Sequence, residues 1–184
     1  MSWIETIAPE KATGRLARIY ERVENQRGKV ANVLQVHSLN PDALKQHLAL
    51  YQTLLFQHSP LSRADRELLA VVISSANNCA YCIIHHREAL AHQTSEEFAR
   101  QVAENPDEAD LNDAQRAMID YAVKLTQDVT SMKEEDVDEL REAGFTDRTI
   151  LDINLITSYF NFVNRIAEGL GVEYNQEEVR GYNY

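Results

Sequence analysis

The chain has 184 residues, of which 44% are apolar and 26% charged, so it can bury a core and does not resemble a disordered chain. Its 18 basic and 29 acidic residues give a net charge of −11, which disfavours nucleic acid as a partner. The two cysteines, Cys79 and Cys82, lie three positions apart and cannot brace a secreted disulfide scaffold. We expect a single domain over residues 1–184.

The sequence predicts neither a membrane span nor a targeting segment. Its longest purely apolar run, Leu68 to Ile73, is far shorter than the roughly 20 residues that a spanning helix needs. The N-terminus has no basic segment followed by an apolar stretch. We therefore expect a cytoplasmic protein with reduced thiols and no membrane partner.

Helices account for the pattern of apolar residues along the whole chain. Only six glycines and four prolines are present, and apolar residues recur at intervals of three and four. The sequence predicts an all-α bundle of about eight helices, the last of which, with its tail, covers about 147–184. Eight expected helices cover about 9–26, 41–57, 63–76, 79–91, a short segment after Thr94, 112–128, 133–143 and 147–168, and a further short one covers about 30–36.

Three of these helices have residues typical of an N-terminal cap three positions before an acidic residue. The pairs are Ser62 with Asp65, Thr94 with Glu97, and Ser131 with Glu134. The helix that contains Leu68–Ile73 is apolar on every side, which predicts a central, buried position. The start of that helix, Leu61 to Arg66, is echoed by Leu111 to Arg116, as in a duplicated unit or in two similar amphipathic helices.

One stretch carries residues suited to chemistry. On a helical wheel at about 100° per residue, with Cys79 at zero, Cys82 falls at about −60° and His86 at about −20°. These three side chains share a narrow face, and His86 lies one turn beyond Cys82. The first turn of a helix favours a thiolate over a thiol, and a histidine can accept the thiol proton. Such a pair can form a sulfenic acid and then a disulfide.

Glu67 lies twelve residues before Cys79, at the start of an apolar helix. If the two helices fold back on each other, its carboxylate reaches the face with the thiols and His86 and can relay a proton.

Two other interpretations remain open at this point. The cysteines can be small buried apolar residues, or Cys79, Cys82 and His86, with Glu67 as a fourth ligand, can bind zinc. Zinc sites of this type usually have a second CxxC pair, which is missing, so redox function is favoured. No Gly-rich phosphate loop or other cofactor motif is present, and we expect no cofactor.

The pattern Glu-x11-Cys-x2-Cys-x3-His resembles the alkyl hydroperoxidase D-like core of the carboxymuconolactone decarboxylase superfamily, and most of all its small "peroxidase-related" members. The similarity is strongest over about 40–100, and the segment 159–170 looks like the last helix of that subgroup. The resemblance implies an all-helical fold that reduces hydroperoxides through a cysteine pair.

The resemblance also implies a role for each matched residue. Cys82 would be the peroxidatic thiol, Cys79 the resolving thiol, His86 the base, and Glu67 part of the proton relay. Tyr81 stands where the founding peroxidase has a second histidine. The implied partners are a hydroperoxide, an unknown thiol reductant and further copies of the chain, as a dimer, trimer or hexamer. The alternative is a redox-sensing or scaffold oligomer that uses the same cysteine pair without catalysis.

Overall fold

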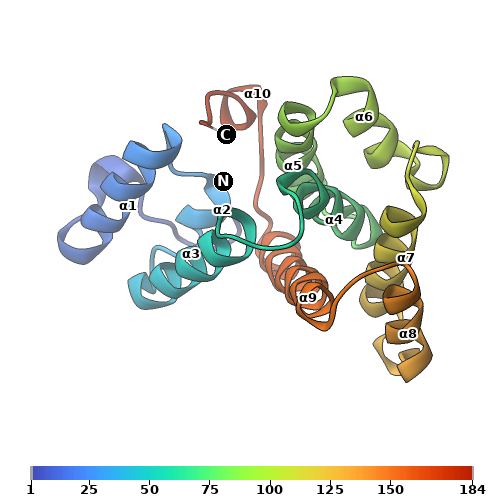
Figure 1. Ribbon diagram of the computed structural model, residues 1–184. Coiled ribbons are helices and arrows are strands. Elements are labelled where there is room, and N and C mark those ends of the chain that lie inside the picture. Colours follow the sequence, from blue (N-terminus) through green and yellow to red (C-terminus); the bar gives the residue numbers. More distant parts are fainter. Residues whose placement is uncertain (1, 184) are drawn as a thin grey trace. The chain divides into compact units, whose positions relative to one another are not determined.

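The computed structural model describes residues 2–183 except the side chain of Gln176, and these residues form helices and no strands. This part of the chain has ten α-helices, eight of them with seven residues or more, which confirms the predicted all-α class (Figure 1). Their bounds are α1 (Gly14–Arg27), α2 (Asn32–Gln35), α3 (Pro41–Phe56), α4 (Arg63–Ala76), α5 (Ala80–Gln93), α6 (Glu96–Glu104), α7 (Asp113–Gln127), α8 (Glu134–Glu142), α9 (Asp147–Gly169) and α10 (Gln176–Val179). Short 3₁₀ turns cover Pro9–Lys11, Pro106–Glu108 and Val129–Ser131.

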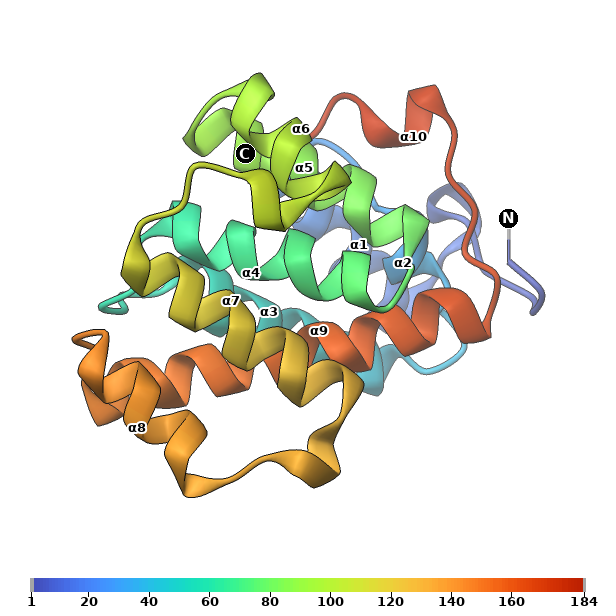
Figure 2. The ribbon, with the colours of Figure 1, turned by 90° about the vertical axis from the view of Figure 1, so that its right-hand side faces the viewer.

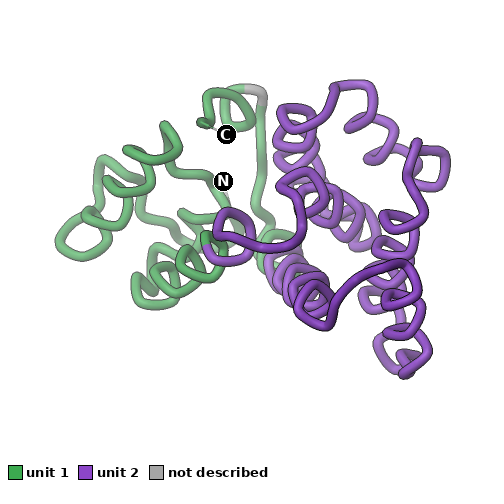
Figure 3. Tube along the Cα trace, in the orientation of Figure 1, with its two compact units in different colours: residues 1–52, 165–184 green, residues 53–164 purple. Residues whose placement is uncertain are grey.

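The chain divides into two compact units, which Figure 3 distinguishes by colour. Unit 1 comprises residues 1–52 and 165–184, and unit 2 comprises residues 53–164. The single domain expected over the whole chain stays a prediction. Within residues 2–183, no helix combines the length and the apolarity needed to cross a membrane.

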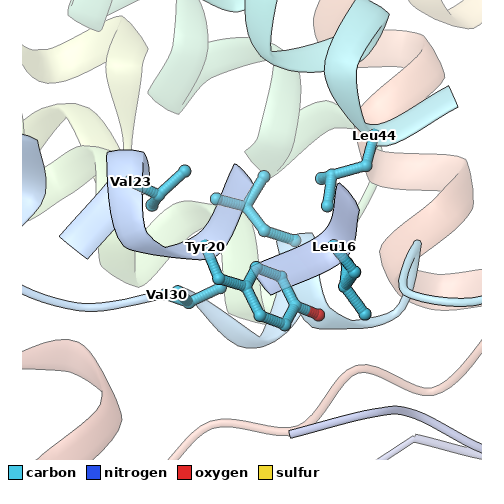
Figure 4. Close-up of a cluster of buried hydrophobic side chains, with 6 residues drawn as sticks. Leu16, Tyr20, Val23, Val30 and Leu44 are labelled. Atoms are coloured by element: carbon cyan, nitrogen blue, oxygen red, sulfur yellow. The ribbon is translucent and has the colours of Figure 1, made fainter. Parts of the chain in front are cut away.

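Unit 1 is built on an apolar cluster between α1 and α3 (Figure 4). Leu16, Tyr20 and Val23 lie on one stripe of α1, and Leu44 of α3 is completely buried against them. Because the stripe repeats at three and four residues, a regular helix places every one of these side chains on the same core. The six buried members of the cluster are Leu16, Tyr20, Val23, Val30, Leu34 and Leu44.

The C-terminal tail packs onto the same unit. The Asn183 amide donates a hydrogen bond to the Arg27 carbonyl, and the Lys29 ammonium lies 4.7 Å from the centre of the Tyr182 ring. Gly28 ends α1 with a left-handed φ of 86°, and a side chain there would approach the Gly181 carbonyl to 2.8 Å. Glycine at 28 therefore ends α1 and also leaves room for the tail.

Unit 2 is organised around α4, which packs against α5, α6 and α7 (Figure 2). The side chains of Leu68–Ile73 are all 1% exposed or less, as expected for a helix that is apolar on every side. The predicted central position of this helix is confirmed.

The repeated start of α4 and α7 has a structural counterpart. The Arg66 guanidinium donates to the carbonyls of Leu55 and Leu61, and the Arg116 guanidinium donates to carbonyls of the segment before α7. Both arginines lie four residues after the N-cap and bind backbone that precedes their own helix. The Gln115 amide donates to the Asp65 carboxylate at 2.9 Å, so the starts of the two helices lie side by side.

Some predicted helix boundaries are wrong, although the helices themselves exist. Ser62 caps α4 by accepting the Asp65 amide proton at 3.0 Å, as predicted. For α6, the cap is Ser95 rather than Thr94, because the Ser95 hydroxyl is the group that meets the Phe98 amide. Ser131 lies in a 3₁₀ turn and does not cap α8. Cys79 precedes α5 instead of starting it. The first predicted helix is split into Pro9–Lys11 and Gly14–Arg27.

The cluster in unit 1 predicts a contrast between two leucines of α3. Leu44→Ala should lower the free energy of unfolding by about 2–5 kcal/mol, because Leu44 is 0% exposed and its removal leaves a cavity. Leu50→Ala is the matched control in the same helix and should change stability little, since Leu50 is 45% exposed. Urea unfolding of both variants tests this, and equal losses would contradict the assignment of the core.

A pair of histidines lies beside this cluster, although the two are ten positions apart in the sequence. His37 Nδ1 lies 2.9 Å from the Val33 carbonyl and must donate to it, so His37 Nε2 accepts from His47 Nδ1 at 3.1 Å. Burial lowers the pKa of His37, against a smaller opposing effect of the Val33 carbonyl. Burial, followed by repulsion from His37, lowers the pKa of His47 to about 3. The folded chain therefore holds both rings neutral.

This pair predicts a loss of stability on mild acidification. As the pH falls below about 6.5, the two histidines bind protons in the unfolded chain but stay neutral in the folded one. The free energy of unfolding therefore falls by up to about 1.4 kcal/mol per pH unit for each site. His47→Gln should make the slope of unfolding free energy against pH shallower between about pH 6.5 and 5, above the range in which carboxylates titrate. The exposed His58, replaced by Gln, should keep the wild-type slope; the same slope in all three proteins would contradict this account.

Candidate functional site

The turn between α4 and α5 places Cys79 directly before the first residue of α5. Asn78 takes a left-handed φ of 55°, which asparagine tolerates, and the Cys79 amide donates to the Ser74 carbonyl at 2.9 Å. The Asn77 side-chain amide donates to the oxygens of Asn161 and Asn164, each at 3.0 Å. The turn is thus held by polar side chains of α9 within unit 2.

Both cysteines are buried thiols at the start of a helix. Cys79 is the N-cap of α5 and is 0% exposed, and Cys82, the third residue of α5, is 3% exposed. His86 lies one helical turn beyond Cys82, so their side chains are neighbours on α5. The first turn of a helix directs backbone N–H groups and the positive end of the helix dipole toward this position.

Glu67 of α4 meets His86 of α5 at the centre of the site. The Glu67 carboxylate is 0% exposed, and its Oε2 atom lies 2.7 Å from His86 Nδ1. The other oxygen, Oε1, accepts a hydrogen bond from the Arg63 guanidinium one turn earlier on α4. The structure therefore brings Glu67 and His86 together, although they are nineteen residues apart.

The charge of Glu67 is maintained by these two partners. Burial alone would raise the pKa of the Glu67 carboxyl, but the interactions with His86 and Arg63 outweigh burial and lower the pKa below its ordinary value. Since a buried carboxylate is stable only when paired and hydrogen-bonded, the site depends on both partners. Arg63 is itself fixed by a hydrogen bond to the Leu55 carbonyl and by the Phe56 ring, 3.8 Å from the guanidinium carbon.

The histidine ring is fixed on its other side as well. The Phe160 ring meets the His86 ring edge to face, with centres 4.7 Å apart, and the His86 side chain is 15% exposed. With Nδ1 occupied by Glu67, the other ring nitrogen, Nε2, is the one able to exchange a proton elsewhere.

Tyr81 and His85 form a separate pair on α5. Their rings stack with centres 4.2 Å apart, and His85 Nδ1 lies 2.8 Å from the Tyr81 carbonyl. Tyr81 is 3% exposed. It therefore fills space beside the cysteines as a buried ring.

Sequence reasoning did not single out Arg63. The signal that could have found it is its spacing of four residues before Glu67 on the same helix, a spacing typical of ion pairs. Among the described residues, no group of three or more His, Cys, Asp and Glu side chains is arranged to hold a metal ion.

The fold and site define a class of all-α protein with a cysteine pair at a helix N-terminus and a buried carboxylate–histidine pair beside it. The profile of the carboxymuconolactone decarboxylase family matches residues 41–128. The crystal structure of an alkylhydroperoxidase AhpD core, an uncharacterized peroxidase-related protein from Ralstonia eutropha JMP134, is 31% identical, with a TM-score of 0.88, over 97% of this chain and 94% of that one. The chain belongs to the carboxymuconolactone decarboxylase family and has its AhpD-like fold.

Two further solved structures have the same fold. An uncharacterized peroxidase-related protein from Silicibacter sp. TM1040 is 32% identical, with a TM-score of 0.84, over 96% of this chain and 91% of that one. The debrominase Bmp8, in complex with 2,3,4-tribromopyrrole, shares the fold at 19% identity and a TM-score of 0.78, over 97% of this chain and 96% of that one. Among curated proteins, no sequence matches.

The position of Arg63 predicts the response of Glu67 to its removal. Arg63→Gln should raise the pKa of the Glu67 carboxyl, because burial is then opposed only by His86, and should lower stability by about 1.5–3 kcal/mol for the lost charged hydrogen bond. Carboxyl ¹³C NMR titration measures the pKa directly. The Glu67 carboxylate stabilises the fold at pH values above its unfolded pKa, and this contribution is lost as the pH falls through its folded pKa. Because Arg63→Gln raises the folded pKa, this variant should unfold in acid at a higher pH than wild type.

Arg100→Gln is the matched control, since it removes an arginine from an exposed ion pair of the same unit. It should leave the Glu67 titration unchanged. A Glu67 pKa that is the same in Arg63→Gln and in wild type would contradict the electrostatic role given to Arg63.

Proposed function

We propose that this chain is a thiol-dependent peroxidase that reduces hydroperoxides through Cys82 and Cys79. The observation that carries the proposal is the fully buried Glu67 carboxylate bonded to His86, one helical turn from Cys82. A buried carboxylate that fixes one ring nitrogen of a histidine leaves the other nitrogen to act as a base. Similarity to peroxidase-related proteins of 31% and 32% identity supports the same chemistry.

The reaction consumes one hydroperoxide for each cysteine pair. The Cys82 thiol gives its proton to His86, and the thiolate sulfur attacks the terminal oxygen of the hydroperoxide. The O–O bond breaks, an alcohol leaves with the proton from His86, and Cys82 becomes a sulfenic acid. The Cys79 sulfur then attacks the Cys82 sulfur, water leaves, and a disulfide forms. An external dithiol reductant returns both cysteines to thiols by disulfide exchange and is itself oxidised.

Glu67 acts in this scheme through His86. Its negative charge stabilises the imidazolium that forms when the Cys82 thiol loses its proton, and its hydrogen bond holds the ring in one orientation. Glu67 is therefore proposed as a positioning residue that also completes the proton relay. The homo-oligomer expected for this chain belongs to the same proposal and is tested by light scattering of the purified protein.

The proposal predicts that reaction with peroxide depends on Cys82 and that the internal disulfide depends on both cysteines. With dithiothreitol as reductant and cumene hydroperoxide as substrate, Cys82→Ser should abolish turnover, because serine is a poor nucleophile at neutral pH. Cys79→Ser should keep the first reaction with peroxide and lose the internal disulfide. The assay follows peroxide loss, and equal rates for wild type and Cys82→Ser would overturn the assignment of Cys82.

The role of His86 is tested against another histidine of the same helix. His86→Gln should slow turnover by about 10²–10⁴-fold, the usual contribution of a general base, and should flatten the dependence of rate on pH. His92→Gln is the matched control, since His92 lies on α5 with 54% of its side chain exposed. Equal rates in the two variants would contradict the role of His86.

The second candidate is a redox-sensing or scaffold protein that forms the disulfide without turnover, which the burial of both thiols favours. It predicts rapid disulfide formation, no sustained peroxide consumption at any dithiol concentration, and a change in elution volume on size exclusion between reduced and oxidised protein. Sustained turnover with no change in elution volume would exclude it.

A further inference from the structure

A pocket of about 360 Å³ lies in unit 1 between α1 and α3, which Figure 1 shows next to each other. The proposed function does not use it. Its walls include Ile19, Val23 and Leu48, and the Gln52 side chain donates to Gln26 at 2.9 Å, which joins the two helices at one end. This volume is at the lower end of the range of small-molecule sites, about 300–1,000 Å³.

The charged side chains around this pocket are all positive. Four of the 18 basic residues in the chain line it, namely Arg15, Arg18, Arg22 and Lys45, although the chain as a whole carries −11. Arg15 pairs with Asp42. Within residues 2–183, the side chains of Arg18, Arg22 and Lys45 form neither an ion pair nor a hydrogen bond. Three cations therefore face the pocket without an anion.

This arrangement costs stability unless something else balances it. Arg18 and Arg22 are four residues apart on one helix face, a spacing at which like charges repel. Glu21 of α1 and Asp42 of α3 lie within three residues of these cations and offset part of the positive charge, whereas charges farther away are screened over about 8 Å at physiological salt. An anion in the pocket meets three donors at its rim and apolar side chains beneath.

We propose that this pocket is a binding site for a small organic anion, a sulfonate, phosphate or carboxylate joined to an apolar group. The acid group lies between Arg18, Arg22 and Lys45, where charge-assisted hydrogen bonds form, and the apolar part lies on Ile19, Val23 and Leu48. Two helices supply complementary parts of the site: α1 gives the two guanidinium groups, and α3 gives the ammonium and the leucine. Both chemical properties of the ligand are needed for binding.

The test uses anilinonaphthalene sulfonate, which has one acid group and aromatic rings, titrated into the full-length reduced protein by calorimetry. We expect one site per chain. The double variant Arg18→Gln with Arg22→Gln should weaken binding at least about tenfold, since two charge-assisted contacts are lost, and should be at least as stable as wild type because the repulsion is relieved. The matched control, Lys11→Gln with Lys133→Gln, removes the same charge from exposed residues outside the pocket and should bind as wild type does.

Two comparisons decide the outcome. Methanesulfonate, which keeps the acid and lacks the rings, should bind much more weakly than the probe; equal affinity would make this a plain anion site and overturn the proposal. Unchanged binding in the Arg18 and Arg22 double variant, or an equal loss in the Lys11 and Lys133 control, would also overturn it. Because the probe and the variants leave the cysteines untouched, peroxide turnover is measured in parallel and separates this result from the proposed function.

Discussion

The site in unit 2 depends on one buried negative charge. Glu67 is completely buried, and an isolated carboxylate there would be too costly to remain ionised, so two hydrogen-bond donors from different turns of the structure must meet it. Arg63 comes from the same helix, and His86 comes from the next one. The contact between Glu67 and His86 joins α4 to α5, and Cys82 lies one helical turn before His86 on α5. The buried charge of Glu67 thus underlies both the contact between the two helices and the proposed chemistry.

The sequence predicted much of this arrangement because its signals are local. The all-α class follows from spacing at three and four residues, and the buried position of α4 follows from Leu68–Ile73. The placement of Cys79, Cys82 and His86 on one face follows from helical geometry alone. What local spacing could not show is that α5 folds back so that its histidine meets Glu67, because tertiary packing decides that contact. The cap of α6 was misplaced by one residue since Thr94 and Ser95 are both good caps, and the chain path selects between them.

Interactions between distant residues were the ones that sequence reasoning missed. His37 and His47 are ten positions apart in the sequence, and only the approach of α3 to the turn after α2 joins them. The basic pocket has the same explanation, since Lys45 joins the arginines of α1 only when α3 packs beside that helix. These features belong to unit 1, whereas the cysteine pair, Glu67 and His86 belong to unit 2.

The central claim is that Cys79 and Cys82 react together with a hydroperoxide, and one measurement tests it without any reductant. The fully reduced protein is mixed with one equivalent of cumene hydroperoxide, the remaining thiols are alkylated, and the peptide that contains both cysteines is weighed by mass spectrometry. The account predicts that this peptide loses two hydrogen atoms in proportion to the peroxide consumed, as an internal disulfide requires. Two thiols that remain fully alkylated while the peroxide persists would contradict it.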